Sequence, residues 1–203
     1  MAKLYFKYGA MGSSKTAQAL ITKYNYEEND MRVWLIKPSA DTRDGKATLR
    51  SRIGLEAEVE VMAPDADIYN RFRATQADSC NAVIVDECQF LTPEQIDQLR
   101  AIVDDFNVPV MCFGLRTDFQ TKLFPGSRRL MEIADTIQEI KTICDCAAKA
   151  TVNARIDSEG HIVTEGAQVV LGGNDSYIAM CHRCWMQGIR EHRKIKLHGQ
   201  TQE

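Results

Sequence analysis

Residues 9–16, Gly-Ala-Met-Gly-Ser-Ser-Lys-Thr, constrain the fold of this chain more than any other segment. They follow an aromatic, β-prone run at 3–8 and precede residues 17–21, which have helical spacing and no helix breaker. Strand, glycine-rich loop and helix in this order predict a phosphate-binding loop, because backbone N–H groups at a helix N-terminus surround a phosphate. The predicted nucleotide-binding residues of this loop are Gly9, Ala10, Met11, Gly12, Ser13, Ser14, Lys15 and Thr16.

The last residues of the loop predict its chemistry. Lys15 would neutralise charge on the β- and γ-phosphates of ATP, and the Thr16 hydroxyl would ligate Mg²⁺. Ser14 stands where the usual pattern has its last glycine, so its backbone must be strained or the loop must tolerate a Cβ atom. Taken alone, the motif leaves open a simple Gly/Ser turn that starts an ordinary helix.

A second motif lies about seventy residues downstream. The apolar run at 83–85 predicts a buried strand, and Asp86 and Glu87 follow it directly. An acid at this point of a phosphate-loop protein reaches the Mg²⁺, a role we predict for Asp86. Glu87 would polarise a water molecule in an ATPase or accept the proton of a hydroxyl group in a kinase. Two solvated acids at a strand end are the alternative.

Strand and helix signals alternate through the first two thirds of the chain. Thr92 and Pro93 predict the start of a helix that runs to about residue 106, with threonine as N-cap. The alternation predicts the α/β class, a mostly parallel sheet flanked by helices, with ligands at the carboxyl ends of the strands. Further elements are expected as strands at 32–37, 58–62 and 108–114, a helix at 68–75 and a polar loop at 41–54.

The chain has seven cysteines, four of them in two close pairs. Cys144 with Cys146 and Cys181 with Cys184 suit a tetrahedral Zn²⁺ site, because thiolates are soft ligands and four of them close a structural site. His182 is an alternative ligand, although Cys184 restores the familiar two-residue gap after Cys181. The other three cysteines lie in apolar segments and are interpreted as core residues: Cys80, Cys88 and Cys112.

The cysteine pairs also suggest a domain organisation. From residue 142 onward, short β-like pieces at 151–155 and 167–171 are joined by a turn, and a helix is expected from about Arg183. We therefore predict a phosphate-loop domain at 1–141 and a zinc-stapled β-ribbon at 142–203. Zinc would stabilise so short a ribbon, which has little core of its own.

Charge and hydropathy limit the choice of partners. The formal net charge of -3 gives no general attraction to nucleic acid or anionic membranes, and only residues 190–196 are notably basic. No apolar run approaches membrane-spanning length, and the N-terminus has no secretory signal. These observations predict a cytoplasmic protein that binds neither nucleic acid nor membranes.

Five segments of the chain carry a family resemblance. They are the loop at 9–16, Asp-Glu-Cys-Gln-Phe at 86–90, Gly-Leu-Arg-Thr-Asp-Phe-Gln at 114–120 with Phe124, the paired cysteines, and Gly-Gly-Asn-Asp-Ser-Tyr at 172–177. Together they resemble the type II, zinc-containing thymidine kinases over residues 3–187, in the family's order and spacing. The chain departs from the family at Ser14, at Gly12 and in its basic tail.

The resemblance implies an activity and the residues that perform it. It implies ATP-dependent phosphorylation of the 5′-hydroxyl of thymidine, and of deoxyuridine, with Glu87 as the catalytic base. Arg43 would approach the transferring phosphoryl group, and Gln89 would join the cofactor-binding residues. The family also implies a homotetramer that thymidine triphosphate inhibits. The implied thymidine-binding residues are Met11, Phe90, Leu115, Phe119, Phe124, Val169, Val170, Leu171, Gly172, Gly173 and Tyr177.

Two other classes of function share part of these motifs. A zinc-ribbon ATPase that acts on DNA would have the phosphate loop, the acids and the cysteines, but it should also show a basic face with stacking platforms. A non-catalytic nucleotide-binding module would keep Lys15 and lose the two acids, and both acids are present.

Overall fold

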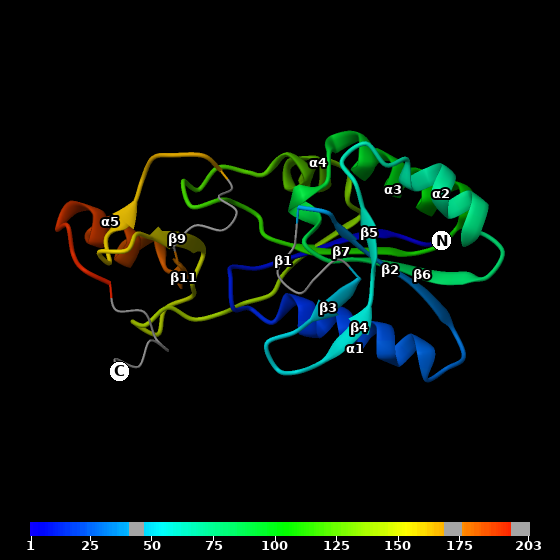
Figure 1. Cartoon of the computed structure of the whole chain (residues 1–203), viewed down its shortest axis with the longest axis horizontal. Helices are drawn as coiled ribbons and strands as arrows, with labels where there is room; N and C mark the ends of the chain where they lie inside the picture. Colours follow the sequence, from blue (N-terminus) through cyan, green and yellow to red (C-terminus); the bar gives the residue numbers. More distant parts are fainter. Residues whose placement is uncertain (41–46, 169–175, 196–203) are drawn as a thin grey trace. The chain divides into compact units, whose positions relative to one another are not determined.

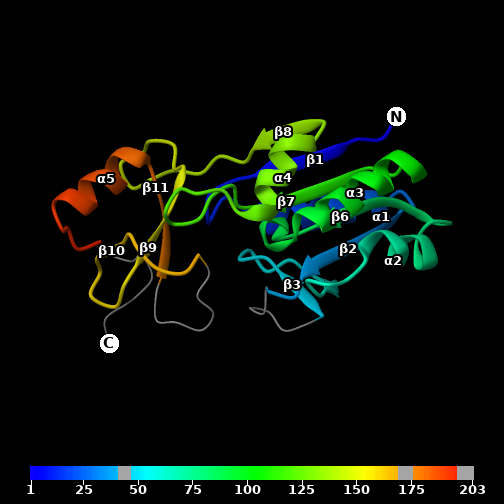
Figure 2. The same ribbon diagram turned by 90° about the horizontal axis from the view of Figure 1, so that it is seen from above.

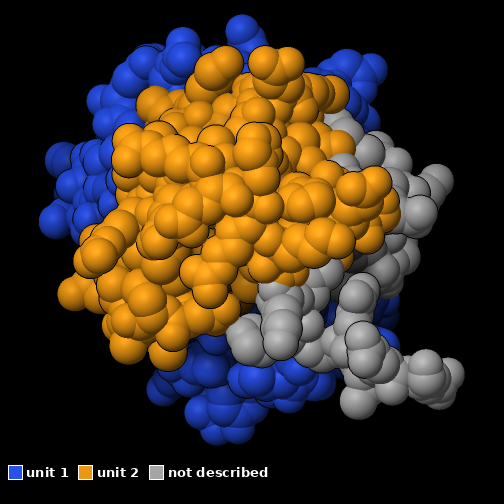
Figure 3. Space-filling view, turned by 90° about the vertical axis from the view of Figure 1, so that its left-hand side faces the viewer, with its two compact units in different colours: residues 1–8, 14–116, 124–140 blue, residues 9–13, 117–123, 141–203 orange. Residues whose placement is uncertain are grey.

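The computed structural model describes residues 1–40, 47–168 and 176–195. Contacts divide the chain into two compact units (Figure 3), and each is described by itself. Unit 1 contains residues 1–8, 14–116 and 124–140. Unit 2 contains residue 141 onward together with two short segments, 9–13 and 117–123.

A six-stranded sheet forms the centre of unit 1 (Figure 1). Its strands are ordered β5-β2-β6-β7-β1-β8, and every pairing between neighbours is parallel. The parallel arrangement confirms the predicted α/β class, and it brings the ends of β1 and β6 to the same edge of the sheet. The strands are β1 (Leu4–Tyr8), β2 (Arg32–Pro38), β5 (Glu60–Met62), β6 (Cys80–Val85), β7 (Val110–Gly114) and β8 (Thr136–Glu139).

Helices cover both faces of this sheet (Figures 1 and 2). Helix α1 (Lys15–Glu27) lies on one face, whereas α2 (Ile68–Thr75), α3 (Pro93–Phe106) and α4 (Pro125–Ile133) lie on the other. Residues of β6 alternate between the two resulting cores, because successive side chains of a strand point to opposite faces. Val83 and Val85 join the core under α2 and α3, and Ala82 and Ile84 join the core under α1.

Helix α3 begins as its sequence predicts. The Thr92 hydroxyl accepts a hydrogen bond from the Gln95 backbone N–H at 3.2 Å, and the Gln95 side-chain carbonyl accepts one from the Thr92 N–H. This capping box satisfies two backbone donors at the helix end, and Pro93 occupies the first turn. Among the described residues, none of the helices combines the length and the apolar character needed to cross a bilayer.

The prediction of a loop at 41–54 is wrong for part of this segment, which contains a short strand. Strand β3 (Thr48–Arg50) pairs antiparallel with β4 (Glu56–Glu58), and the Leu49 side chain is buried in the core beneath α1. Leu49 anchors this hairpin together with Ala57 of β4, which packs against the same core, while the remaining residues of the two strands are polar. Residues 41–46 lie outside the described part of the chain.

Unit 2 is built on a three-stranded antiparallel ribbon. Its central strand is β9 (Val152–Ile156), flanked by β10 (Ile162–Val163) and β11 (Ser176–Met180). Helix α5 (His182–Arg190) follows, one residue before the expected start. Ala167 and Gln168 lie outside any strand, and the rest of the strand expected at 167–171 falls beyond the described residues.

Candidate functional site

The loop between β1 and α1, which the sequence predicts to bind phosphate, turns tightly just before the helix. Gly12 and Ser14 both take left-handed conformations, at φ 74° and φ 61°, and the Ser13 N–H donates to the Ala10 carbonyl at 3.2 Å. Helix α1 begins immediately afterwards at Lys15. Only glycine adopts this conformation without strain, so Ser14 holds the loop's shape at an energetic cost.

Thr16 and Asp86 meet at the carboxyl edge of the sheet. The Thr16 hydroxyl donates to the Asp86 carboxylate, with an Oγ1–Oδ2 distance of 2.8 Å, although the residues lie seventy positions apart. Asp86 follows the last residue of β6 and is almost completely buried. A hydroxyl and a carboxylate are oxygen ligands of the kind that Mg²⁺ binds beside phosphates, so the donor set fits this ion.

Glu87 has an unusual backbone conformation. Its φ and ψ of 50° and 37° lie in the left-handed region, which costs a residue with a side chain about 1–2 kcal/mol. The turn leads into a short 3₁₀ helix at Cys88–Phe90. Strain of this kind collects at functional sites, where surrounding contacts hold it in place. Glu87, the predicted base, is one of the non-glycine residues with this strained conformation.

Gln89 links Glu87 to the end of β7. The Gln89 side-chain nitrogen donates to Glu87 Oε2, and its carbonyl oxygen accepts the Leu115 N–H at 3.0 Å. Gly114 leaves room for this side chain, because a Cβ atom there would stand 2.5 Å from Gln89 Oε1. Gln89, which the sequence places among the nucleotide-binding residues, thus has both ends of its amide bonded within the protein.

Three of the predicted thymidine-binding residues gather around this point of unit 1. The rings of Phe90 and Phe124 meet edge to face, with centroids 5.7 Å apart. The Leu115 carbonyl accepts a hydrogen bond from the Ser127 hydroxyl at 2.6 Å, so its backbone is held at both polar atoms. Phe90 and Leu115 remain partly exposed, whereas Phe124 is buried.

Met11, Phe119 and Tyr177 belong to unit 2. The Met11 N–H donates to the side-chain oxygen of Asn153 on β9 at 2.8 Å. The guanidinium of Arg155 lies 5.1 Å from the centre of the Phe119 ring, a cation–π contact. Tyr177 pairs with Arg155 across β11 and β9. Tyr177 is therefore part of the ribbon, and side chains of β9 contact the backbone of Met11 and the ring of Phe119.

The loop at 117–123 is organised by Asp118. Its Oδ1 atom accepts the N–H groups of Gln120 and Lys122, each at 2.9 Å, and its Oδ2 atom accepts the Gln168 side-chain amide at 2.8 Å. A buried carboxylate is stable when its lone pairs are satisfied in this way. Asp118 thereby connects the segment that carries Phe119 to the segment that ends at Gln168.

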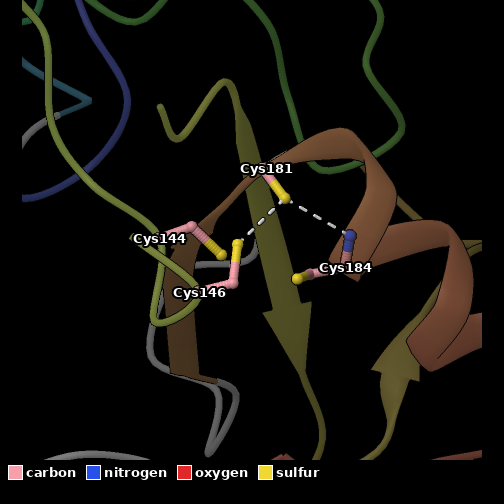
Figure 4. A group of neighbouring side chains, drawn as sticks. All are labelled: Cys144, Cys146, Cys181 and Cys184. Atoms are coloured by element: carbon pink, nitrogen blue, oxygen red, sulfur yellow. Dashed lines mark hydrogen bonds between the residues drawn. The ribbon is translucent and has the colours of Figure 1, made fainter. Parts of the chain in front are cut away.

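The four paired cysteines converge in unit 2 (Figure 4). All four sulfur atoms lie within 4.8 Å of one another, and the Cys146 and Cys181 sulfurs are 3.6 Å apart. Tetrahedral zinc with Zn–S bonds of about 2.3 Å needs sulfurs about 3.8 Å apart, so the cluster fits this metal. The His182 ring packs instead against the ring of Trp185, with centroids 5.5 Å apart.

The remaining cysteines are core residues, as the sequence indicates. Cys80, Cys88 and Cys112 are all buried. Burial raises the pKa of the Cys80 thiol, and it raises that of Cys88 further, where the Cys112 thiol adds to the effect. Thiols that resist ionisation are poor nucleophiles and poor metal ligands.

Four polar residues that organise unit 2 were not identified from the sequence. Six site residues that were predicted from it lie outside the part of the chain that the structure describes. Asn153, Arg155, Asp118 and Gln168 were not predicted as site residues. Asn153 and Arg155 stand at alternate positions of a predicted strand, and Asp118 lies in the 114–120 motif, but neither signal identifies their partners. Six predicted residues lie outside the described part of the chain: Arg43, Val169, Val170, Leu171, Gly172 and Gly173.

Comparison with known proteins assigns the family. A sequence model described as thymidine kinase matches residues 2–185. The chain belongs to the thymidine kinase family. This family assignment confirms the resemblance inferred from the five motifs and makes the chain a nucleoside kinase.

Individual relatives agree with the family assignment over nearly their whole length. A thymidine kinase from Ruegeria pomeroyi is 45% identical over 188 residues, which cover 92% of this chain and 95% of the relative. One from Agrobacterium fabrum is 46% identical over 188 residues, covering 92% and 97%. One from Shewanella oneidensis is 45% identical over 184 residues, covering 90% and 96%.

Proposed function

We propose that this chain transfers the γ-phosphate of ATP to the 5′-hydroxyl of thymidine, and of deoxyuridine. The hydrogen bond between Thr16 and Asp86 carries this proposal. It joins the helix start of a phosphate loop to the acid of a second strand, the pairing that phosphoryl-transfer enzymes use for a nucleotide and its cation. Family membership supplies the nucleoside as acceptor.

Each polar residue of unit 1 has a role in this proposal. Lys15, which is buried at the start of α1, neutralises charge on the phosphates. Thr16 and Asp86 would hold Mg²⁺, which when bound neutralises the β- and γ-phosphate oxygens. Glu87 accepts the proton of the 5′-hydroxyl as the new P–O bond forms. The hydrogen bond from the Gln89 side chain holds the Glu87 carboxylate in place for this role.

The nucleoside would be recognised chiefly by apolar and aromatic side chains. Aromatic faces and methionine suit a flat pyrimidine base. We propose that these side chains are Phe90, Leu115 and Phe124 of unit 1 and Met11, Phe119 and Tyr177 of unit 2. The roles predicted for Arg43 and residues 169–173 are proposals from the family resemblance alone.

Zinc is proposed as a structural ion held by Cys144, Cys146, Cys181 and Cys184. Four thiolates leave no open coordination position, so the ion would stabilise the ribbon and take no part in the reaction. A homotetrameric assembly and inhibition by thymidine triphosphate are further proposals that rest on the family. The cytoplasmic location predicted from the sequence is proposed as well.

Transfer of radiolabel from [γ-³²P]ATP tests the proposed function. The purified chain is incubated with thymidine, deoxyuridine, other deoxynucleosides, single-stranded DNA or no acceptor. Label should appear in thymidine and deoxyuridine monophosphates, with little release of inorganic phosphate when no nucleoside is present. Phosphate release that depends on DNA, without labelled nucleotide, would refute the proposal in favour of a zinc-ribbon ATPase.

A further inference from the structure

One face of strand β9 buries polar side chains. Val152, Ala154 and Ile156 point into the apolar core of unit 2. Asn153 and Arg155 alternate with them and therefore point to the opposite face. Both are nevertheless buried, with only 3% of Asn153 exposed. Burying an amide is unfavourable unless its hydrogen bonds are made, so the partners of Asn153 matter.

The Asn153 amide is bonded at both ends to distant backbone. Its Oδ1 atom accepts the Met11 N–H at 2.8 Å, and its Nδ2 atom donates to the Thr117 carbonyl at 2.9 Å. These partners fix the orientation of the amide, because an N–H group needs an acceptor and a carbonyl needs a donor. If the amide were flipped, its NH₂ group would face the Met11 N–H and its oxygen would face the Thr117 carbonyl, and neither pair can form a hydrogen bond.

The two partners belong to two functional segments. Met11 lies in the middle of the loop that precedes Lys15, and Thr117 lies two residues before Phe119. Thr117 and Leu123 form a β-bridge, so the carbonyl that Asn153 holds is at the base of the 117–123 loop. One amide therefore sets the position of both segments relative to the ribbon. Two further contacts, Arg155 on Phe119 and Gln168 on Asp118, join other residues of the same loop to unit 2.

We propose that Asn153 is a positioning residue that couples the phosphate loop to the nucleoside-binding loop through Met11 and Thr117. This inference rests on the proposed function, in which residues 9–16 bind ATP and the 117–123 segment contacts thymidine. The side-chain oxygen of Asn153 holds Met11 in the proposed ATP-binding loop, and its side-chain nitrogen holds Thr117 at the base of the proposed thymidine-binding loop. The two roles can be separated chemically.

Two substitutions separate them. Asn153→Asp keeps an acceptor for the Met11 N–H but places a carboxylate oxygen against the Thr117 carbonyl, where a donor is needed. Asn153→Leu has nearly the same shape and removes both bonds, which leaves a buried N–H and a buried C=O unsatisfied. Leaving a buried polar group unsatisfied is expected to change an affinity by about tenfold, which corresponds to about 1.4 kcal/mol.

The matched control is Val152→Ala in the same strand. It removes apolar volume from the ribbon core on the face that Asn153 does not use. Its effect on stability is comparable in size to that of losing a hydrogen bond, while the Met11 and Thr117 contacts stay intact. Thermal unfolding of all three variants establishes the stability against which the kinetic effects are compared.

The experiment measures KM for ATP and for thymidine, together with hydrogen exchange of the peptide that contains Met11. Asn153→Asp should raise KM for thymidine about tenfold and change KM for ATP less than about threefold, with exchange at Met11 as in the wild type. Asn153→Leu should raise both KM values about tenfold and speed exchange at Met11. Val152→Ala should leave all three readouts near wild type.

Two results would overturn the inference. One is an equal effect of Asn153→Asp on both substrates. The other is kinetic changes in Val152→Ala that match those of the Asn153 variants at the same loss of stability. Absence of thymidine phosphorylation by the wild type would refute the proposed function instead, and hydrogen exchange at Met11 would still decide whether Asn153 holds the loop.

Discussion

The side-chain nitrogen of Gln89 donates a hydrogen bond to the carboxylate of Glu87, two residues before it in the chain. The same amide accepts the Leu115 N–H at the end of β7. Glu87 is thus connected through one buried glutamine to Leu115, the residue that directly follows β7. A carboxylate held in this way is ready to accept a proton with little reorganisation.

The first prediction concerns Glu87 itself. Glu87→Gln preserves the shape of the side chain and removes its ability to accept a proton. We expect kcat to fall by about 10²-fold or more, with thymidine binding largely kept. Steady-state kinetics with a direct thymidine-binding measurement tests this. A higher KM at unchanged kcat would show that Glu87 binds substrate and that the base lies elsewhere.

The second prediction tests the connection through Gln89. Gln89→Met keeps the side chain's length and loses both hydrogen bonds, so kcat should fall about tenfold through a misplaced Glu87 carboxylate. In the Glu87→Gln background the same substitution should have a much smaller effect on kcat, because no base remains to be positioned. An equal effect on kcat in both backgrounds would show that Gln89 does not act by positioning Glu87 and that it only supports the Leu115 backbone.

Lys15 gives the third prediction. Lys15→Met removes the charge that stabilises the transferring phosphoryl group, at an expected cost of about 3–4 kcal/mol in the transition state, or more than 10²-fold in kcat/KM. Lys23→Met is the control on the same helix, where Lys23 forms an ion pair with Glu27. That variant should keep its turnover in the radiolabel assay. Turnover of Lys15→Met near the wild-type value would contradict the phosphate-loop assignment.

Ser14 gives a fourth prediction, on stability. Because its left-handed backbone costs a non-glycine residue about 1–2 kcal/mol, Ser14→Gly should raise the free energy of unfolding by about 0.5–1 kcal/mol after the added chain entropy of glycine. Denaturant unfolding measures this. KM for ATP should change by less than about twofold, because the loop keeps its conformation.

A control for Ser14 is available between α1 and β2. Asp30 is also left-handed, at φ 57°, and lies outside the phosphate loop. Asp30→Gly should stabilise less than Ser14→Gly, since aspartate tolerates this conformation better than most residues. A loss of stability in Ser14→Gly would show that the serine side chain contributes more than its backbone strain costs.

Local signals in the sequence predicted the elements of unit 1 well where they were strong. Helix α2 has the bounds expected from its spacing, and Thr92 caps α3 as its threonine-proline pair indicates. The β3–β4 hairpin was missed because each strand has three residues and most of them are polar or charged. Only Leu49 and its pairing partner Ala57 contact the core, and one apolar residue in each strand gives no periodicity to detect.

The polar contacts of unit 2 could not be predicted for a different reason. Asn153 in a strand resembles a solvent-facing residue, since an isolated polar side chain is usually exposed. It is buried by segments 142 and 36 residues away in the chain, and only the tertiary fold reveals these. The role of Asp118 is hidden in the same way, because its partner Gln168 lies 50 residues distant.

The last prediction concerns the cysteine cluster. Elemental analysis should find one zinc per chain, because the four sulfurs have the spacing of a single tetrahedral site. Cys146→Ser replaces a soft thiolate with a hydroxyl and should lower zinc content by at least half. The variant should also speed hydrogen exchange at residues 142–156, since metal binding stabilises a ribbon of this size.

Two controls separate this effect from other consequences of mutation. Cys80→Ala changes a core cysteine of unit 1 and should keep full zinc content. His182→Ala should keep it as well, because the His182 ring packs on Trp185. Full zinc occupancy in Cys146→Ser, with loss in His182→Ala, would replace the four-cysteine site with one that uses the histidine.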